Sequence, residues 1–386
     1  MADARVRLGM VGGGQGAFIG GVHRIAARID DRYELVAGAL SSKPEVAKAS
    51  AEELHIALDR SYDSYEAMFK AEAAREDGIE AVAIVTPNHM HFPVAKAALE
   101  AGINVICDKP VTRTLEEAEE LAQICAKSDA FFALTHNYSA YPLVRYAREL
   151  VEQGKLGNVR LVQVEYPQEW LTQASEPGNK QADWRTDPKR SGKAGCLGDI
   201  GTHAFQLATF ISQLELDAVS ADLTAFVEGR AVDDNVHAML RFKGGAKGML
   251  WSSQVAPGCE NGLRIRIFGD KAGLEWAQEK PNELWLTPLA GHHQRITRRD
   301  DNIDSDIAAR GIRIPFGHPE GYLEAFANLY TDVADVLVAK RKGEKHPIEA
   351  WIPGINTGVM GMRFIDAVLR SSDDDGRWTT MKNNKQ

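Results

Sequence analysis

Short apolar runs alternate with helical patterns over the first third of the chain. The runs that predict buried strands are Leu8–Val11, Tyr33–Leu40, Ile79–Thr86, Asn104–Asp108 and Phe131–Thr135. Helical patterns of about 10 to 15 residues separate most of them. Strands connected in this way form βαβ units with right-handed crossovers. Residues 1–135 are therefore predicted to form an α/β domain with a doubly wound parallel sheet.

The pattern changes near Tyr138. Pro142 opens an amphipathic helix that ends at Gly154, and a further helix is expected after Asp199. Strands then follow one another directly, some of them separated by glycine turns, which is typical of an antiparallel meander. The expected strands are Val159–Tyr166, Ala218–Val227, Asn235–Phe242, Gly248–Val255, Leu263–Phe268 and Glu283–Thr287.

Residues 136–386 are therefore predicted to form a second, α+β domain with an open, mainly antiparallel sheet. Leu223, Ala225 and Val227 alternate with polar neighbours, as one face of such a sheet would. Residues 289–314 are expected to be a long polar loop. Helices over Tyr322–Ala339 and about Thr357–Arg370 close the chain, and the pattern leaves open whether they pack back on the first domain. The solvent-facing side of the sheet suits a partner subunit in a homodimer or homotetramer.

Composition narrows the class of protein. The chain has 386 residues, of which 44% are apolar and 26% charged, and its net charge of −9 argues against nucleic acid or an anionic membrane as a partner. No apolar run approaches the roughly 20 residues of a membrane span, and no signal peptide is seen, so a cytoplasmic location is expected. The four cysteines are widely spaced and predict reduced thiols, with Cys196 a small buried residue.

The first strand leads into the glycine-rich stretch Gly12-Gly13-Gly14-Gln15-Gly16-Ala17-Phe18. Gly12, Gly14 and Ala17 fit the G-x-G-x-x-[GA] turn that places a dinucleotide pyrophosphate on a helix N-terminus. Gly12 is expected to make the tight turn and Gly14 to let the backbone approach the phosphates. Ala17 is expected to let the helix pack close to the sheet. Gln15 and Phe18 are included in the predicted cofactor site.

The end of the second strand bears on which dinucleotide binds. NAD-binding domains commonly place an acidic residue there to hold the ribose hydroxyls. This chain has Ser41, Ser42 and Lys43 instead. Two hydroxyls and a cation suit a 2′-phosphate, so NADP is an alternative to NAD. The other interpretation is that Lys43 is a solvated loop residue.

Ligands of such sheets bind beyond the carboxyl ends of the strands. The predicted cofactor residues at these ends, besides those of the glycine turn, are Ser41, Ser42, Lys43, Thr86, Asn88, His91, Asp108 and Lys109. Lys109 is also a candidate catalytic residue, because an amine held there can bind a substrate hydroxyl and favour its alkoxide. Pro110 restricts Asp108 to extended geometry and is a candidate cis residue. A plain surface lysine is the alternative.

A second candidate group is Asp199 and His203. The two are four residues apart and share a face if a helix begins near Asp199. A neutral histidine can take a hydroxyl proton at pH 7, and Asp199 can orient the sugar or the imidazole. The alternative is Asp199 as a helix N-cap with His203 in the core. We expect no metal site, because no third ligand stands at a suitable spacing.

The loop Gln168–Arg190 contains Trp170, Trp184 and Arg185. Tryptophan faces with polar groups suit a sugar ring, so these residues, with Asn137, Tyr138, Asp199 and His203, are the predicted substrate site. Arg185, Lys189, Arg190 and Lys193 could instead recognise an anionic substituent. Structural packing is the alternative for the tryptophans. The pair His292-His293 is expected in an exposed loop.

Taken together, these motifs resemble the Gfo/Idh/MocA oxidoreductases over nearly the whole chain. The resemblance rests on Val11-Gly12-Gly13-Gly14, Thr86-Pro87-Asn88-His89-Met90-His91, Asp108-Lys109-Pro110 and Gly198-Asp199-Ile200-Gly201-Thr202-His203. It implies a Rossmann domain followed by an α/β domain whose open sheet usually pairs with another subunit. It also matches Lys109 to the family's active-site lysine, and Asp199 with His203 to its D-x-x-x-H pair. Asp108 stands where the family commonly has glutamate.

The resemblance implies NAD(P)-dependent hydride transfer between nicotinamide and a hydroxyl or keto group of a sugar, glycoside or polyol. Oxidation at C3 of a pyranoside is one form of this hypothesis, with His203 taking the proton and Lys109 stabilising the alkoxide. An alternative within the family is a redox-assisted glycosidase acting on a glycoside, such as a sulfonated or uronic one. A non-catalytic dinucleotide sensor is the third hypothesis.

Overall fold

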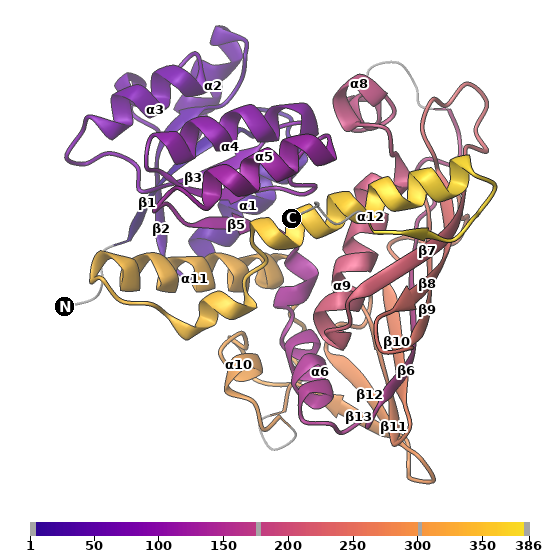
Figure 1. The fold of residues 1–386 in the computed structure, drawn as a ribbon. Coiled ribbons are helices and arrows are strands. Elements are labelled where there is room, and N and C mark those ends of the chain that lie inside the picture. The colour runs from indigo at the N-terminus through magenta and orange to yellow at the C-terminus, as the bar shows by residue number, and fades with distance from the viewer. Residues whose placement is uncertain (1–4, 175–178, 300–302, 382–386) are drawn as a thin grey trace. The chain divides into compact units, whose positions relative to one another are not determined.

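The computed structural model describes residues 5–174, 179–299 and 303–381, and the chain divides into two compact units. The first unit consists of residues 1–137 and 326–359, and the second of residues 138–325 and 360–386 (Figure 1). A segment late in the sequence therefore belongs to the first unit.

The first unit contains a parallel sheet of five strands in the order β2-β1-β3-β4-β5. This order reverses direction at β1, which confirms the predicted doubly wound fold. β3 is buried along its whole length, as its continuous apolar sequence predicts. The strands are β1 (Val6–Gly12), β2 (Tyr33–Ala39), β3 (Ala81–Val85), β4 (Asn104–Cys107) and β5 (Phe132–Leu134).

Helices connect these strands and cover the sheet. The ones described are α1 (Phe18–Ile29), α2 (Pro44–Glu53), α3 (Tyr65–Ala73), α4 (His91–Glu100), α5 (Leu115–Cys125) and, from Phe326 on, α11 (Tyr322–Arg341). Thr114 and Glu117 form a capping box that starts α5. The buried Tyr330 hydroxyl lies 2.8 Å from His23 Nδ1, and the Tyr330 carbonyl accepts the Tyr33 hydroxyl at 2.7 Å. These bonds tie α11 to α1 and β2.

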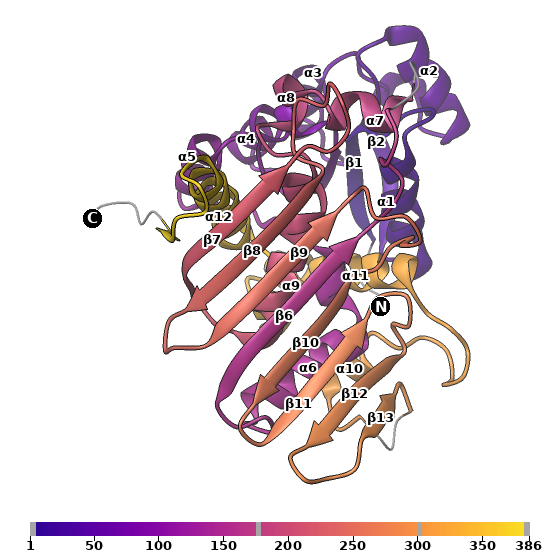
Figure 2. The ribbon, with the colours of Figure 1, turned by 90° about the vertical axis from the view of Figure 1, so that its right-hand side faces the viewer.

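The second unit contains a sheet of nine strands in the order β13-β12-β11-β10-β6-β9-β8-β7-β14 (Figure 2). All neighbours are antiparallel except β6 and β9, which are parallel. The simple meander expected from the sequence is therefore wrong, because β6 separates β9 from β10. The strands are β6 (Val159–Pro167), β7 (Leu216–Thr224), β8 (Asn235–Phe242), β9 (Lys247–Ser253), β10 (Arg264–Gly269), β11 (Ala272–Ala277), β12 (Glu283–Pro288), β13 (Gln294–Thr297) and β14 (Thr379–Thr380).

Two further expectations about the second unit also need correction. β7 ends at Thr224, so Leu223 is only half-buried and Ala225 and Val227 lie beyond the strand. The buried positions of β7 are earlier, at Val219 and Ala221 among others. The region expected to be a loop over residues 289–314 contains β13 and α10 (Asp306–Ala309), while residues 300–302 lie outside the described part.

Helices pack on one face of this sheet. They include α6 (Pro142–Glu152) and α9 (Thr202–Ser212), which contact β6 and β9 to β12 between them. Phe205 on α9 stacks on Phe364 of α12 (Ile355–Asp373), with ring centroids 4.2 Å apart. The short helices α7 (Lys180–Arg185) and α8 (Pro188–Ser191) lie in the segment that the sequence predicted as a loop. The opposite face of the sheet is the one turned to the viewer in Figure 2.

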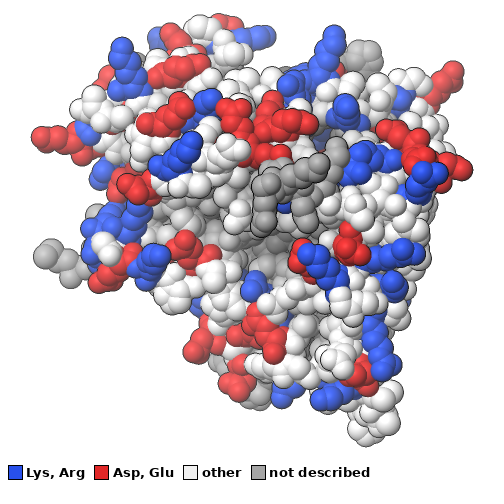
Figure 3. Space-filling model, viewed as in Figure 1, with Lys and Arg blue, Asp and Glu red and all other residues white. Residues whose placement is uncertain are grey.

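Surface charge, cysteines, membrane spans and metal clusters bear on the classes of protein considered from the sequence. Acidic and basic side chains are interspersed over the face seen in Figure 3. Within the described residues, no helix is long and apolar enough to cross a membrane, and the cytoplasmic location stays a prediction. All four cysteines are free, and Cys196 is buried as expected. No set of three or more His, Cys, Asp or Glu side chains in the described ranges is grouped to hold a metal.

Candidate functional site

The glycine turn after β1 requires residues without a side chain. Gly12, Gly13 and Gly16 have φ of +79°, +73° and +77°, a region that L-residues rarely adopt. A Cβ on Gly12 would lie 2.9 Å from Thr86 Cγ2 and 3.0 Å from the Val85 carbonyl oxygen. The tight turn predicted at Gly12 is present.

Position 14 requires glycine for a structural reason beyond the one that the motif gives. A Cβ there would lie 2.7 Å from the Leu40 carbonyl oxygen and 2.8 Å from Ser50 Oγ. The Gly14 N–H donates to Leu40 O at 3.1 Å, and the Gln15 N–H donates to Ser50 Oγ at 3.0 Å. The turn is therefore packed against the end of β2 and against α2. Its approach to a pyrophosphate stays a prediction.

Gly20 provides close packing at the start of α1, while the role expected for Ala17 stays a prediction. A Cβ on Gly20 would lie 2.4 Å from Gly13 Cα, so the helix backbone touches the turn. Ala17 is the N-cap residue in extended conformation, and Phe18 follows with 63% of its surface exposed. The positive-φ glycines and the start of a helix at the carboxyl edge of a parallel sheet fit a dinucleotide pyrophosphate.

The predicted ribose-binding residues lie at the end of β2. Ser42 and Lys43 are exposed and Ser41 is half-buried. The Lys43 N–H donates to Ser41 Oγ at 3.1 Å, and α2 begins directly after Lys43. Hydroxyls and a cation are thus gathered at the position where a dinucleotide ribose binds in this fold.

His91 connects the ends of β3 and β4. Its Nδ1 lies 2.7 Å from the Pro110 carbonyl oxygen and its Nε2 lies 2.9 Å from the Thr86 carbonyl oxygen. Burial lowers the pKa of His91 below its usual value. A neutral imidazole carries one N–H, so one of the two ring nitrogens donates to its carbonyl oxygen, and the ring lies between the turns that carry the candidate residues. Thr86 Oγ1 is buried and has no hydrogen-bond partner among the described residues.

The Asp108-Lys109-Pro110 turn follows β4, and its Lys109–Pro110 peptide bond is cis. Asp108 Oδ1 accepts the Lys109 N–H at 2.8 Å and the Thr135 hydroxyl at 2.9 Å. Burial, and next the charge of Lys109, lower the pKa of His136 to about 3. Lys109 is half-buried, and its catalytic role stays a prediction.

Asp199 lies in a π-helical turn, Leu197–Gly201, which leads into α9. The N-cap residues of the turn and of α9 are Cys196 and Gly201, and neither makes a side-chain cap. Asp199 as an N-cap is therefore wrong. Its Oδ2 accepts Arg185 Nε at 3.2 Å and Gln254 Nε2 at 2.9 Å.

His203 follows on α9 with 7% of its surface exposed. Its ring meets the Tyr138 ring edge to face at a centroid distance of 4.8 Å. The Tyr138 and Tyr166 hydroxyls lie 2.5 Å apart, and Tyr166 donates to Asn261 Oδ1 at 2.7 Å. Burial raises the pKa of both tyrosines, which keeps them protonated at neutral pH.

The tryptophan segment lies in the same unit. Arg185 stacks on Trp184 and Trp170, with its guanidinium carbon 4.4 and 5.8 Å from the ring centroids. Trp170 Nε1 donates to Gln168 Oε1 at 2.9 Å, and Gln168 Nε2 donates to Asn261 Oδ1 at 2.8 Å. Arg185 therefore links the tryptophans to Asp199. Residues 175–178 of the segment lie outside the described part.

The structure thus brings together, in the second unit, Tyr138, Trp170, Trp184, Arg185, Asp199 and His203 from the predicted set. Asn137 belongs to the first unit, where its side chain is buried and its Nδ2 has no hydrogen-bond partner among the described residues. The sequence analysis missed Tyr166, Gln168, Gln254 and Asn261, because single polar residues carry no motif. The sequence marked them as site residues only by position, because they lie in strands, just after strands or in turns of the predicted sheet.

Comparisons with known proteins support both units. Residues 6–136 match the model of the oxidoreductase family with an NAD-binding Rossmann fold, and residues 144–275 match the GFO/IDH/MocA C-terminal domain. An uncharacterised oxidoreductase of Bacillus subtilis, YfiI, is 35% identical over 382 residues, covering 98% of this chain and 97% of its own. The levoglucosan dehydrogenase of Pseudarthrobacter phenanthrenivorans is 29% identical over 317 residues, covering 72% of this chain and 75% of its own.

Solved structures agree. An oxidoreductase from Sinorhizobium meliloti is 52% identical with a TM-score of 0.88, covering 97% of this chain and 99% of its own. An inositol dehydrogenase homologue from Azotobacter vinelandii, complexed with NAD+, is 35% identical with a TM-score of 0.93 and covers 97% of both chains. Because this similarity extends over both units, the chain belongs to the Gfo/Idh/MocA family and is an NAD-binding oxidoreductase.

Proposed function

We propose that the chain is a dehydrogenase that transfers hydride between nicotinamide and a secondary hydroxyl of a neutral sugar or polyol. The observation that carries this proposal is the polar network of the second unit, in which Asp199, Tyr138 and Asn261 take part beside aromatic rings. Relatives named as levoglucosan and inositol dehydrogenases support the substrate class.

In this proposal Lys109, Asp199 and His203 are the catalytic residues. His203 takes the hydroxyl proton and Lys109 stabilises the alkoxide that remains. Asp199 binds the substrate and keeps its own negative charge close to the His203 imidazole. The bound cofactor would supply the nicotinamide ring as the hydride acceptor. The glycine turn and the residues after β2, β3 and β4 hold the cofactor.

The pairing of Arg185 with Asp199 favours a neutral substrate over an anionic one. The guanidinium and the carboxylate are 78% and 85% buried at the side-chain level, and a cation so paired has less charge to offer a sulfonate or uronate. The redox-assisted glycosidase that the sequence left open was expected to use this cation. The assay described next therefore includes glycosidase activity as one of its outcomes.

The test incubates the protein with NAD or NADP and panels of polyols, neutral glycosides and anionic glycosides. Nicotinamide absorbance and released sugar are followed together. We expect stoichiometric reduced cofactor with an intact polyol, and turnover lower by at least about 1000-fold in K109A and H203A, with cofactor binding retained in H203A. Sugar released over many turnovers at constant cofactor would establish the glycosidase. Tight cofactor binding without turnover would favour the sensor.

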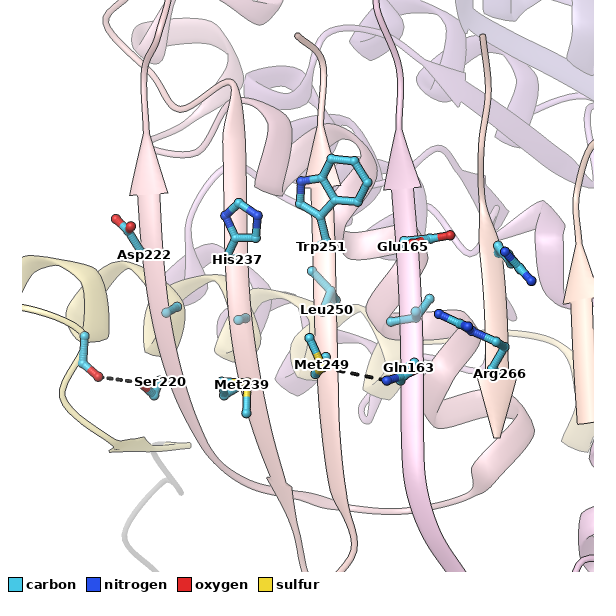
Figure 4. A pocket seen from close by; sticks show the side chains of 15 residues that line it. Gln163, Glu165, Ser220, Asp222, His237, Met239, Met249, Leu250, Trp251 and Arg266 are labelled. Atoms are coloured by element: carbon cyan, nitrogen blue, oxygen red, sulfur yellow. Dashed lines mark hydrogen bonds between the residues drawn. The ribbon is translucent and has the colours of Figure 1, made fainter. Parts of the chain in front are cut away.

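We also propose that the open face of the sheet in the second unit binds a second copy of the chain. A hollow of about 320 Å³ lies on this face, and side chains of β6 to β10 project into it (Figure 4). Met239 and Met249 are half-exposed there, beside Glu165 and Arg266. Apolar side chains flanked by both charges are self-complementary across a twofold axis, because each cation can meet the partner's carboxylate.

The mass of the protein in solution tests this assembly. We expect a dimer or tetramer by light scattering, and a shift to monomer in the double variant M239K/M249K. A matched variant at an exposed residue away from the face, L58K, should leave the mass unchanged. A wild-type monomer, or an unchanged mass in M239K/M249K, would contradict the proposal.

A further inference from the structure

Asp233, in the connection between β7 and β8, bonds to three consecutive residues. Its Oδ1 accepts the Gly195 N–H at 2.6 Å and its Oδ2 accepts the Leu197 N–H at 2.7 Å. Its own carbonyl oxygen accepts the intervening Cys196 N–H at 2.9 Å. One residue therefore fixes the whole segment that precedes the π-helical turn.

Asp233 lies so close to position 195 that this position requires glycine. A Cβ on Gly195 would lie 2.2 Å from the Asp233 carbonyl oxygen, so the two backbones touch. Asp233 is 8% exposed. Its neighbour Asp234 pairs with Arg230 at 3.1 Å, whereas the Asp233 carboxylate accepts the N–H groups of Gly195 and Leu197. Burial raises the pKa of Asp233 to about 6.

Burying a carboxylate costs free energy even where N–H groups bind it. Such costs concentrate at functional sites. Here the carboxylate has two acceptor oxygens for two N–H groups that point the same way. An asparagine has only one acceptor and would turn its NH₂ toward the other donor.

The segment that Asp233 fixes leads directly to the candidate catalytic residues. Leu197 opens the π-helical turn, and the Asp199 N–H donates back to the Gly195 carbonyl oxygen at 2.9 Å. π-Helical turns are rare, and they frequently occur at functional sites. A turn of this kind needs external support to keep Asp199 at Arg185 and Gln254.

We propose that Asp233 is a positioning residue that holds the π-helical turn, and through it Asp199 and His203, in the geometry for catalysis. The inference rests on the proposed dehydrogenase function for its catalytic consequence. Its structural consequence, the anchoring of residues 195–201, does not depend on that function.

The test compares D233N with R230Q in the full-length protein. R230Q removes a buried ion pair in the same connection but leaves the bonds to Gly195 and Leu197. We expect D233N to lower kcat for polyol oxidation about 100-fold, as a misplacement near 1 Å can do, with the Kd for NAD unchanged. We expect R230Q to lower the Tm with kcat per folded molecule unchanged.

Hydrogen exchange provides a readout that needs no turnover. The amides of residues 195–201 should exchange faster in D233N and not in R230Q, while those of α1 should be unchanged in both. Faster exchange with wild-type kcat would overturn the catalytic part, and unchanged exchange would overturn the anchoring. If the wild type oxidises no polyol, the proposed function fails, and exchange still decides the anchoring.

A double-mutant cycle separates positioning from general destabilisation. If Asp233 acts through Asp199 and His203, then D233N should add little to the loss of kcat already caused by D199N and H203A together. Fully additive losses would overturn the proposal. If D233N does not fold, D233S takes its place, because a hydroxyl can accept one of the two N–H groups without a buried charge.

Discussion

Lys43 and Ser42 stand exposed where β2 ends, at the position that decides the choice between NAD and NADP in this fold. A 2′-phosphate would meet a cation and hydroxyl donors there. We expect K43A to raise the KM for NADP about 10-fold, the loss of one charge-assisted bond, with the KM for NAD changed less than about twofold. S42D should raise the KM for NADP and lower the KM for NAD. Steady-state kinetics with each cofactor measures both, and an unchanged KM for both cofactors in K43A would show that Lys43 is only solvated.

Single residues also show what the sequence can and cannot predict. Gly12 and the cis Lys109–Pro110 bond followed from local geometry, so the motif sufficed. Gly14 was expected for a different reason, because its neighbour Leu40 comes from another strand end. Gln254 and Asn261 were missed, since their partners Asp199 and Tyr166 are distant in sequence and no local pattern marks the pairing.

At the scale of elements, α1 allows a matched pair of glycine substitutions. A Cβ on Gly20 would lie 2.4 Å from Gly13 Cα, whereas a Cβ on Gly21 has no atom within 4 Å. We expect G20A to lower the free energy of unfolding by about 1–3 kcal/mol, since backbone must move. G21A should raise it by up to about 1 kcal/mol through helix propensity. Urea denaturation measures both, and equal effects would show that the turn does not pack on α1.

The strands of the first unit followed from hydrophobic pattern because each βαβ unit is local. The second sheet did not follow in the same way. Its central pair, β6 and β9, is parallel and joins segments about 80 residues apart, with β6 inserted beside β10. Pattern identified most of these strands, but the order depends on pairings that no local signal encodes.

At the scale of the whole molecule, buried titratable groups set how stability depends on pH. Burial lowers the pKa of His23 to about 4 and that of His136 to about 3, from 6.5. The unfolded chain then binds more protons than the folded one between these values and 6.5, so stability is lost as the pH falls. Asp233 acts oppositely, because its pKa rises from 3.8 to about 6 and its folded form binds the extra proton.

The buried histidines, His91 included, outweigh the one aspartate, so we expect the protein to lose stability between pH 6.5 and pH 5. The contribution of His23 alone is roughly 1.5 kcal/mol over this interval. Urea denaturation at the two pH values should therefore show a smaller loss in H23Q than in the wild type. Y330F removes the hydroxyl bonded to His23 and should lower stability at both pH values while keeping the difference between them. The exposed His292 gives the control, because H292Q should change neither value. A wild type equally stable at both pH values would show that these histidines take up protons in the folded state as readily as in the unfolded chain.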